Sequence, residues 1–480
     1  MRRDTLEGVV ATRPGSASGS SSSAASAAIL MLCAWGTVAV ADQRDPRLEG
    51  LFQRLHAAGD AVEATAIEQR IWQVWTSSGD EELDALMARG VDAMNEGDRQ
   101  GALRAFDALV AAAPDFAEAW AWLSSTHSSI YASGQDRSAE RRASAKTSYE
   151  KALELKPGLP IGLRAQAFYE YWVELRYEDA IDTFEKARQG LPSDTRILAG
   201  MAYAARRAHR LDDAKRYLQQ AIELDPADAY LYVEHALTYI YLREYDEGLR
   251  IVAQSLEQDP DQYTAQCVLA QWGTLATGDV ESGTRWASVV PRSADSEVGW
   301  FWFWHLVWQQ RYADAAEHAR SVDLPNLNTW WYTRPKSLLL GLGLRFGGKN
   351  QEAAAAFELA RIELQQAIAV ALPDDFMGRG KLHGALALAL AGLGKRDEAI
   401  RESEVAIEQH SYDRDLLADG RLIEQAMVYA LLGETDRALA AAEHLLSIPS
   451  IFTIHEIALN PVWESVRDDP RFAELRAKYL

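Results

Sequence analysis

One short motif in the sequence has the spacing of a phosphate-binding loop. Gly343, Gly348 and Lys349 match most of that loop, in which backbone N–H groups cradle phosphates and the lysine reaches them. Asn350, however, stands where Ser or Thr would hold magnesium, and the stretch follows an expected helix instead of a strand. The motif therefore predicts a turn between helices, and no cofactor is expected.

A second motif has the start of a zinc-protease helix. His455-Glu456 opens the pattern, but Leu459 occupies the position of the second histidine. The other histidines are scattered, and the only cysteines are Cys33 and Cys267, whereas a cysteine zinc site needs several ligands at set spacings. We expect no metal site and no catalytic residues. The formal net charge of -21 also argues against nucleic-acid binding, since such a surface repels phosphate backbones.

The sequence between positions 300 and 308 is unusually rich in tryptophan. Trp300, Trp304 and Trp308 are spaced i, i+4, i+8, which places them on one face of a helix. Tyr and Trp bring large, rigid contact area and dominate binding hot spots, so this face predicts an aromatic binding trough. Alternatively, the helix is apolar all round because it is buried, with Trp302 and Phe303 on its packing face. The sequence leaves both interpretations open.

Prolines recur through the chain at a nearly constant interval. Pro157, Pro192, Pro226 and Pro260 follow one another at intervals of roughly 34 residues. Proline ends a helix because it has no backbone N–H to donate. A fixed period of this length indicates a repeat architecture, in which each unit is one pair of helices.

Small and large residues also alternate in a fixed order within each period. Gly90 and Ala102 precede Phe106, and Ala180 precedes Phe184. Small residues let two antiparallel helices approach closely, and large ones fill the gap to the next unit. The pattern resembles the tetratricopeptide repeat, a helix–turn–helix unit of roughly 34 residues. The resemblance implies an all-α, right-handed α-solenoid of about ten units with a C-terminal capping helix, because one unit cannot bury both of its faces.

The same resemblance implies a partner-binding groove, because the first helix of each pair lines the concave side of such a solenoid. Grooves of this kind bind extended peptides or helices. Aligning the repeat with this sequence gives the groove residues Tyr169, Trp172, Tyr203, Arg206, Tyr241, Trp272, Trp300, Trp304 and Trp308.

Four further segments resemble a narrower group of bacterial repeat regions. They are Gln135–Arg141, Leu446–Ser450, Leu459–Trp463 and Arg467–Phe472. In that group the repeats often follow an adenylate cyclase, a Ser/Thr kinase or a winged-helix domain. The stretch before position 82 is too short for a cyclase or a kinase, so no signalling activity is expected from the resemblance.

The stretch 1–41 has the features of a secretory signal. Arg2-Arg3 and a serine-rich run precede an uncharged, mostly apolar stretch that ends in Ala39-Val40-Ala41. We expect export, to the periplasm, or else retention at the inner membrane by an uncleaved anchor. The expected segments are the signal at 1–41, a helical segment at 42–81, a first repeat arc at 82–320, an irregular hinge at 321–333, a second arc at 334–449 and a capping segment at 450–480.

These features predict a non-enzymatic scaffold or adaptor that binds a protein or peptide partner in its concave groove. One alternative is a sensory or regulatory subunit that acts beside a separate signalling protein. Another is a small-molecule binder that uses the aromatic residues between Trp300 and Trp308, which predicts a closed pocket instead of an open groove.

Overall fold

The computed structural model describes residues 46–56, 66–67, 70–71, 73–74, 78, 80–290, 296–329 and 331–480. The signal predicted at 1–41 lies outside the described residues. The chain forms two compact units. We call them the N-terminal unit, which runs to Glu174 and includes Thr183–Asp194, and the C-terminal unit, which comprises Leu175–Asp182 and Thr195–Leu480.

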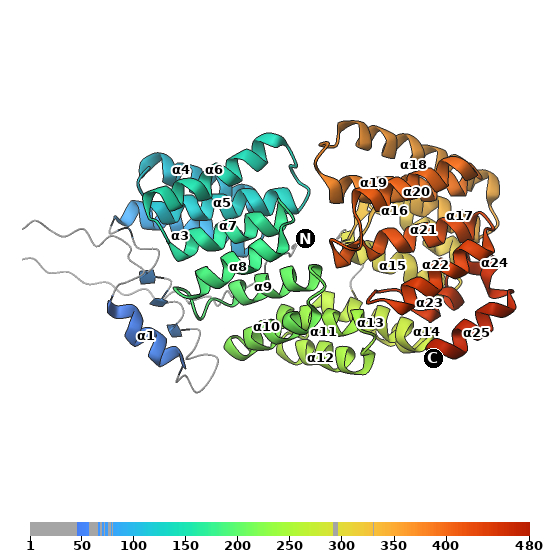
Figure 1. Cartoon of the computed structure of the whole chain (residues 1–480), viewed down its shortest axis with the longest axis horizontal. Coiled ribbons are helices and arrows are strands. Elements are labelled where there is room, and N and C mark those ends of the chain that lie inside the picture. Colours follow the sequence, from blue (N-terminus) through green and yellow to red (C-terminus); the bar gives the residue numbers. More distant parts are fainter. Residues whose placement is uncertain are drawn as a thin grey trace, which may run out of the picture. The chain divides into compact units, whose positions relative to one another are not determined.

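The N-terminal unit consists of helices arranged in antiparallel pairs (Figure 1). Side-chain caps fix where several of them begin: Asp80, Asp98 and Ser138 each accept hydrogen bonds from backbone N–H groups of the first turn. Its helices are α1 (Pro46–His56), α3 (Glu81–Asn95), α4 (Arg99–Ala112), α5 (Ala117–Ala132), α6 (Ala139–Leu155), α7 (Pro160–Trp172) and the second half of α8 (Tyr177–Arg188).

The C-terminal unit continues the same pairing and adds a short β-hairpin and a terminal group of small helices (Figure 1). Its paired helices are α9 (Thr195–Arg207), α10 (Leu211–Leu224), α11 (Ala229–Tyr241), α12 (Tyr245–Gln258), α13 (Tyr263–Thr277), α14 (Val280–Ala287), α15 (Ser296–Trp308), α16 (Tyr312–Ser321), α17 (Lys336–Phe346), α18 (Asn350–Val370), α19 (Phe376–Gly392), α20 (Arg396–Gln409), α21 (Asp419–Leu431) and α22 (Thr435–Ser447). Its remaining elements are β1 (Asn326–Asn328), β2 (Thr333–Pro335), η1 (Leu416–Ala418), α23 (Ile454–Leu459), η2 (Pro461–Trp463), α24 (Glu464–Arg467) and α25 (Pro470–Tyr479).

Close contact between glycine and phenylalanine holds the helix pairs together. A Cβ atom on Gly90 would lie 2.5 Å from the ring of Phe106, so only glycine allows α3 to approach α4 this closely. Phe357 fits between Gly341 and Gly392 in the same way, since a Cβ atom added to either glycine would lie 2.6 Å from its ring. From α3 to α22 the described helices form ten consecutive pairs. The prediction of an all-α solenoid of stacked helix pairs is therefore confirmed.

The turns inside several pairs place a residue in the left-handed region of backbone conformation. Glycine occupies this position in some pairs, and Gly348 of the phosphate-loop-like motif is one of them, with φ of 76°. Leu175, His209 and Arg243, which follow one another by one repeat period, adopt it without being glycine, with φ of 55°, 62° and 61°. A side chain in this conformation costs about 1–2 kcal/mol, so these positions carry strain that other contacts must offset.

The segment predicted to be a hinge, 321–333, contains strand β1 and the first residue of β2. Strands β1 and β2 pair antiparallel, with Leu327 opposite Arg334, and the side chain of Leu327 is fully buried. None of the helices in the described ranges is both long enough and apolar enough to cross a membrane.

Candidate ligand-binding site

The tryptophans of α13 and α15 line one cavity in the C-terminal unit. Trp272 comes from α13, and Trp300, Trp304 and Trp308 come from successive turns of α15. Trp300 packs edge-on against Trp304, with ring centroids 5.6 Å apart. The cavity has a volume of about 150 Å³. We call it the aromatic cavity.

The opposite face of α15 is also buried. Phe303 and Val307 do not line the cavity, and both are fully inaccessible to solvent. This helix therefore combines the two interpretations of its sequence, since it is apolar all round and still presents a tryptophan face to a cavity.

The hairpin, helix α21 and the terminal segment of the chain also line the aromatic cavity, and we call them its far wall. Trp331 and Tyr332 come from the hairpin, Met427 comes from α21, and Phe452 and Glu456 come from the terminal segment that follows α22. Tyr332 stacks on Trp300, with centroids 5.1 Å apart and an interplanar angle of 27°. The inner side of α11, α13 and α15 is thus covered by the protein's own chain at this point.

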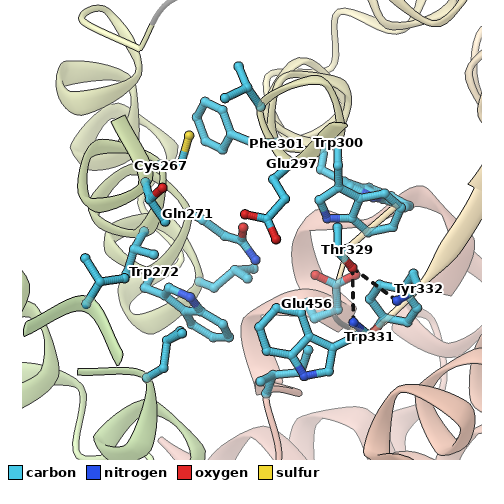
Figure 2. A pocket seen from close by; sticks show the side chains of 18 of the residues that line it. Cys267, Gln271, Trp272, Glu297, Trp300, Phe301, Thr329, Trp331, Tyr332 and Glu456 are labelled. Carbon is cyan, nitrogen blue, oxygen red and sulfur yellow. Dashed lines mark hydrogen bonds between the residues drawn. The ribbon is translucent and has the colours of Figure 1, made fainter. Parts of the chain in front are cut away.

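Hydrogen bonds hold the hairpin loop in place (Figure 2). The hydroxyl of Thr329 accepts hydrogen bonds from the backbone N–H groups of Trp331, at 3.2 Å, and Tyr332, at 3.1 Å. The indole of Trp331 donates to the hydroxyl of Tyr241, and Arg421 donates to the backbone carbonyl of Trp331. The loop is therefore anchored to α11 and α21 together.

A buried ion cluster lies directly behind this wall. Arg334 and Arg421 both pair with Glu424, and the Nε atom of Arg421 lies 2.6 Å from the carboxylate. All three side chains are essentially inaccessible to solvent. Burial lowers the pKa of Arg421. The guanidinium of Arg334 also faces aromatic rings, 4.5 Å from the centroid of Tyr332 and 5.7 Å from that of Trp300.

Three carboxylates line the aromatic cavity. Glu234 forms an ion pair with Arg206. Glu297 comes from the first turn of α15, and Figure 2 shows its carboxylate and the amide of Gln271 pointing into the space between the walls. Glu456 accepts a hydrogen bond of 2.7 Å from the side-chain amide of Asn460. Burial raises the pKa of Glu456 to about 7, which this hydrogen bond only partly offsets.

A buried aspartate closes the C-terminal unit upon itself. Asp415, just before η1, accepts hydrogen bonds from Arg207 Nε at 3.0 Å and from the hydroxyl of Tyr177 at 2.9 Å. His410 Nε2 lies 2.6 Å from the same carboxylate. Burial alone would raise the pKa of Asp415, but Arg207 and His410 hold it well below its usual range.

Two of the turns with a left-handed non-glycine residue, at His209 and Arg243, also hold the C-terminal unit closed. His209 Nε2 lies 2.6 Å from the backbone carbonyl of Tyr412. Arg243 donates to the carbonyls of Leu445 at 2.7 Å and Ile448 at 2.8 Å. Glycine could not make these contacts, which explains why side chains occupy left-handed positions at these two turns. The contacts fix the segment that forms the far wall of the aromatic cavity.

The predicted groove residues fall into two groups. Trp272, Trp300, Trp304 and Trp308 meet at the aromatic cavity, whereas the other five do not line it. Tyr241 is fully buried beneath Trp331, and Arg206 is used internally by Glu234. In the N-terminal unit, Tyr169 is buried with its hydroxyl donating to Glu174 at 2.7 Å, and Trp172 stacks on Phe168 at 4.5 Å. Tyr203 is partly buried, with the guanidinium of Arg206 5.7 Å from its ring centroid.

Several cavity residues were not anticipated from the sequence. Glu297 and Glu456 look like ordinary charges of acidic helices, and Arg334 has no motif around it. Trp331 had a signal, because it lies in the stretch that breaks the repeat spacing. A tryptophan in a break of this kind is a candidate for capping an internal space.

The described residues contain no group of three or more His, Cys, Asp or Glu side chains placed to hold a metal ion. The histidine that opens the zinc-protease-like motif, His455, instead lies against the turn at Gly278. The family comparison matches a repeat and no catalytic domain. The site has the composition of a binding pocket, with aromatic walls and a few polar groups.

Comparison with known proteins identifies the repeat class. Residues 174–232 match the tetratricopeptide repeat family. No curated protein matches the sequence. The helix pairing described above extends the repeat architecture well beyond the matched residues, from α3 to α22.

Solved structures with similar folds are small bacterial repeat proteins. PilF of Pseudomonas aeruginosa is 18% identical, with a TM-score of 0.34, and the match covers 44% of this chain and 90% of that one. TTC0263 of Thermus thermophilus is 18% identical, with a TM-score of 0.33, over 43% of this chain and 98% of that one. YrrB, described as a tetratricopeptide repeat protein with an unusual peptide-binding site, is 20% identical, with a TM-score of 0.30. The match covers 38% of this chain and 92% of that one. Similarity at this level identifies neither a partner nor a ligand for this chain.

Proposed function

We propose that this protein is a non-catalytic repeat protein that binds a small ligand in the aromatic cavity of its C-terminal unit. The observation that carries the proposal is that Trp272, Trp300, Trp304 and Trp308 line one cavity whose far wall is the protein's own chain. A groove for a partner segment would need that inner face to be open. Because the protein's own chain covers part of this face, the arrangement favours the small-molecule alternative of the sequence analysis. A sensory role would be one use of such binding.

The size of the cavity limits the ligand. Its volume is about 150 Å³. An engineered apolar cavity of about this volume takes up benzene, whereas pockets for drug-sized ligands span about 300–1,000 Å³. The proposed ligand is therefore a molecule with the bulk of a single ring or a branched chain, and an extended peptide does not fit inside.

A scaffold that binds a protein or peptide partner is the second candidate. The repeat fold is typical of protein–protein interaction scaffolds, and residues 174–232 match the repeat family. This role would use outer surfaces of either unit and is compatible with a ligand in the aromatic cavity. A regulatory subunit that reports ligand binding to a partner protein would combine the two.

Export to the periplasm remains part of the proposal. It rests on the signal-like pattern of residues 1–41, with an uncleaved membrane anchor as the alternative. Mass spectrometry of the protein from its native host would show a mature chain starting at Asp42 if the signal is cleaved. A full-length chain in the cytosol would rule out export.

The binding proposal is tested by filling the cavity. Gln271 is only partly buried and its amide points into the cavity, so Gln271→Trp places an indole in the space without removing a packed side chain. Gln219 is exposed on α10, and Gln219→Trp adds the same side chain elsewhere. Removing Trp304 is a poorer test, because truncating a tryptophan that is 7% exposed costs about 3–5 kcal/mol and threatens the fold.

Ligand-observed NMR with a panel of neutral, cationic and anionic compounds of single-ring size provides the readout. The proposal predicts that at least one compound binds the parent chain and Gln219→Trp but not a folded Gln271→Trp. Binding that survives in Gln271→Trp, or the absence of binding by every compound, would refute it.

A further inference from the structure

We infer that the aromatic cavity selects a compact organic cation, such as a quaternary ammonium or a small protonated amine. This inference rests on the proposed function and narrows its ligand class. It combines three features of the cavity wall, namely the ring faces, the balance of charges and the volume.

Aromatic rings line the cavity on more than one side. Trp272 lies across the space from Trp300, Tyr332 stacks on Trp300, and Trp304 and Trp331 also line the cavity (Figure 2). The face of an indole or phenol ring carries negative potential and attracts a cation, more strongly when the pair is shielded from water. Several such faces around one space favour a positively charged occupant over a neutral one of equal shape.

The protein already uses these rings to hold a cation. The guanidinium of Arg334 lies over Tyr332 at 4.5 Å and within 5.7 Å of Trp300. Arg334 shares the carboxylate of Glu424 with Arg421. Arg421 also lies 5.7 Å from the ring centroid of Tyr332. Cations in contact with these rings therefore have a precedent within the protein.

The charged side chains that line the cavity disfavour binding of an anion more strongly than binding of a neutral ligand. Glu234, Glu297 and Glu456 line the cavity against one basic side chain, Arg334. Glu234 is neutralised by Arg206. Glu456 has only a neutral partner, the amide of Asn460, among the described residues. An anion would be repelled by the ionised carboxylate of Glu456, whereas a cation would compensate its charge.

The titration of Glu456 points the same way. Desolvation raises the pKa of its carboxyl to about 7, so ionising it inside the empty cavity is costly. A neutral ligand would leave that carboxylate without a compensating charge. A cation beside the carboxylate would offset the cost of ionisation, because an opposite charge nearby favours the ionised form.

The volume of about 150 Å³ restricts the cation to a small one. Choline is a suitable probe, since its trimethylammonium group is compact and its positive charge is spread over methyl groups that can contact ring faces. The uncharged compound 3,3-dimethylbutan-1-ol has the same shape with carbon in place of nitrogen. Comparing the two isolates the effect of charge.

Isothermal titration calorimetry of the full chain at pH 8 with each compound tests the inference. We expect choline to bind at least tenfold more tightly than 3,3-dimethylbutan-1-ol. Glu297→Gln and Glu456→Gln should each weaken choline binding about three- to tenfold and leave the alcohol unaffected. Glu281→Gln removes an exposed carboxylate of α14 that does not line the cavity, and it should change neither.

The outcomes separate this inference from the proposed function. If the alcohol binds as well as choline and Gln271→Trp abolishes both, the cavity binds ligands but the selection for a cation is refuted. If choline binds equally well to Gln271→Trp, it binds elsewhere and the inference also fails. If choline does not bind while other members of the NMR panel do, the ligand class is wrong and the cavity proposal stands.

Discussion

Replacing Asp415 with asparagine should destabilise the C-terminal unit strongly. The carboxylate is 2% exposed and is contacted by Arg207, Tyr177 and His410, with a further hydrogen bond of 3.0 Å from the backbone N–H of Leu417. Asparagine has nearly the same shape but carries no charge, and its NH₂ group would face donors. Breaking one partner of a buried ion pair leaves the other charge uncompensated, which costs about 3–5 kcal/mol.

The assay is urea unfolding followed by tryptophan fluorescence. Asp413→Asn is the matched control, because Asp413 is exposed two residues away and surface changes of this kind cost no more than about 0.5 kcal/mol. We expect the free energy of unfolding to fall by about 3–5 kcal/mol in Asp415→Asn and to stay nearly constant in the control.

The pH dependence gives a second readout of the same residue. The folded state holds the pKa of Asp415 well below its usual range, so its contribution is present near neutral pH. The contribution declines as the pH falls below the unfolded-state pKa, of about 4, and is lost at the still lower folded-state pKa. The stability difference between the parent and Asp415→Asn should therefore shrink in acid. A difference within about 1 kcal/mol at pH 7, comparable to that of an exposed pair, would refute the closure described here.

Three further predictions concern Glu456 and the helix packing. Glu456→Gln should stabilise the protein at pH 8 by up to about 3 kcal/mol and have little effect at pH 4. The reason is that a carboxyl whose folded-state pKa is raised to about 7 loses stability as the pH rises from its unfolded-state pKa to 7. Equal effects at both pH values in thermal unfolding would count against a raised pKa for this partly buried carboxyl. Choline affinity should rise between pH 6 and 8 in the parent, since the cation favours ionised Glu456, and it should stay constant in Glu456→Gln. The other charged groups of the wall, Glu234, Glu297 and Arg334, are present in both proteins. If the affinity of the variant also depends on pH, the titrating group is one of these and not Glu456. Gly341→Ala should destabilise the C-terminal unit by about 1–3 kcal/mol, because the added Cβ atom would lie 2.6 Å from the ring of Phe357. Gly50→Ala should not destabilise the protein, because a Cβ atom added there meets no described atom within 4 Å. Equal melting temperatures for the two variants would contradict the packing argument.

The repeat architecture could be predicted because its physical causes are local. Helices α6, α10 and α12 each end within two residues of a proline of the periodic series. Gly90 and Phe106 are also close in sequence, so their contact follows from the helix pair alone. A repeated local rule of this kind is visible in one sequence without alignment.

The closure of the C-terminal unit could not be predicted in the same way. Arg207 and Asp415 are 208 residues apart, and the carbonyl of Leu445 that Arg243 contacts lies 202 residues further along the chain. Neither contact has a motif, and a backbone carbonyl as acceptor leaves no mark in the sequence. The non-glycine residues at the strained turns were the available signal, because a repeat turn normally favours glycine there.

The candidate site was predictable in part. The spacing of Trp300, Trp304 and Trp308 indicated their common face, and Trp272 followed from the repeat register. What covers that face depends on the closure, so the sequence could not distinguish an open groove from a closed pocket. Glu456 joins the site only because the terminal segment folds back over the tryptophans.

A crystal structure of the protein grown with choline tests the central claim most directly. The account predicts ordered ligand density inside the aromatic cavity, between Trp272 and Trp300 and within contact of their ring faces. An empty cavity with choline bound elsewhere on the chain, or an open inner face with the terminal segment displaced from the tryptophans, would contradict it.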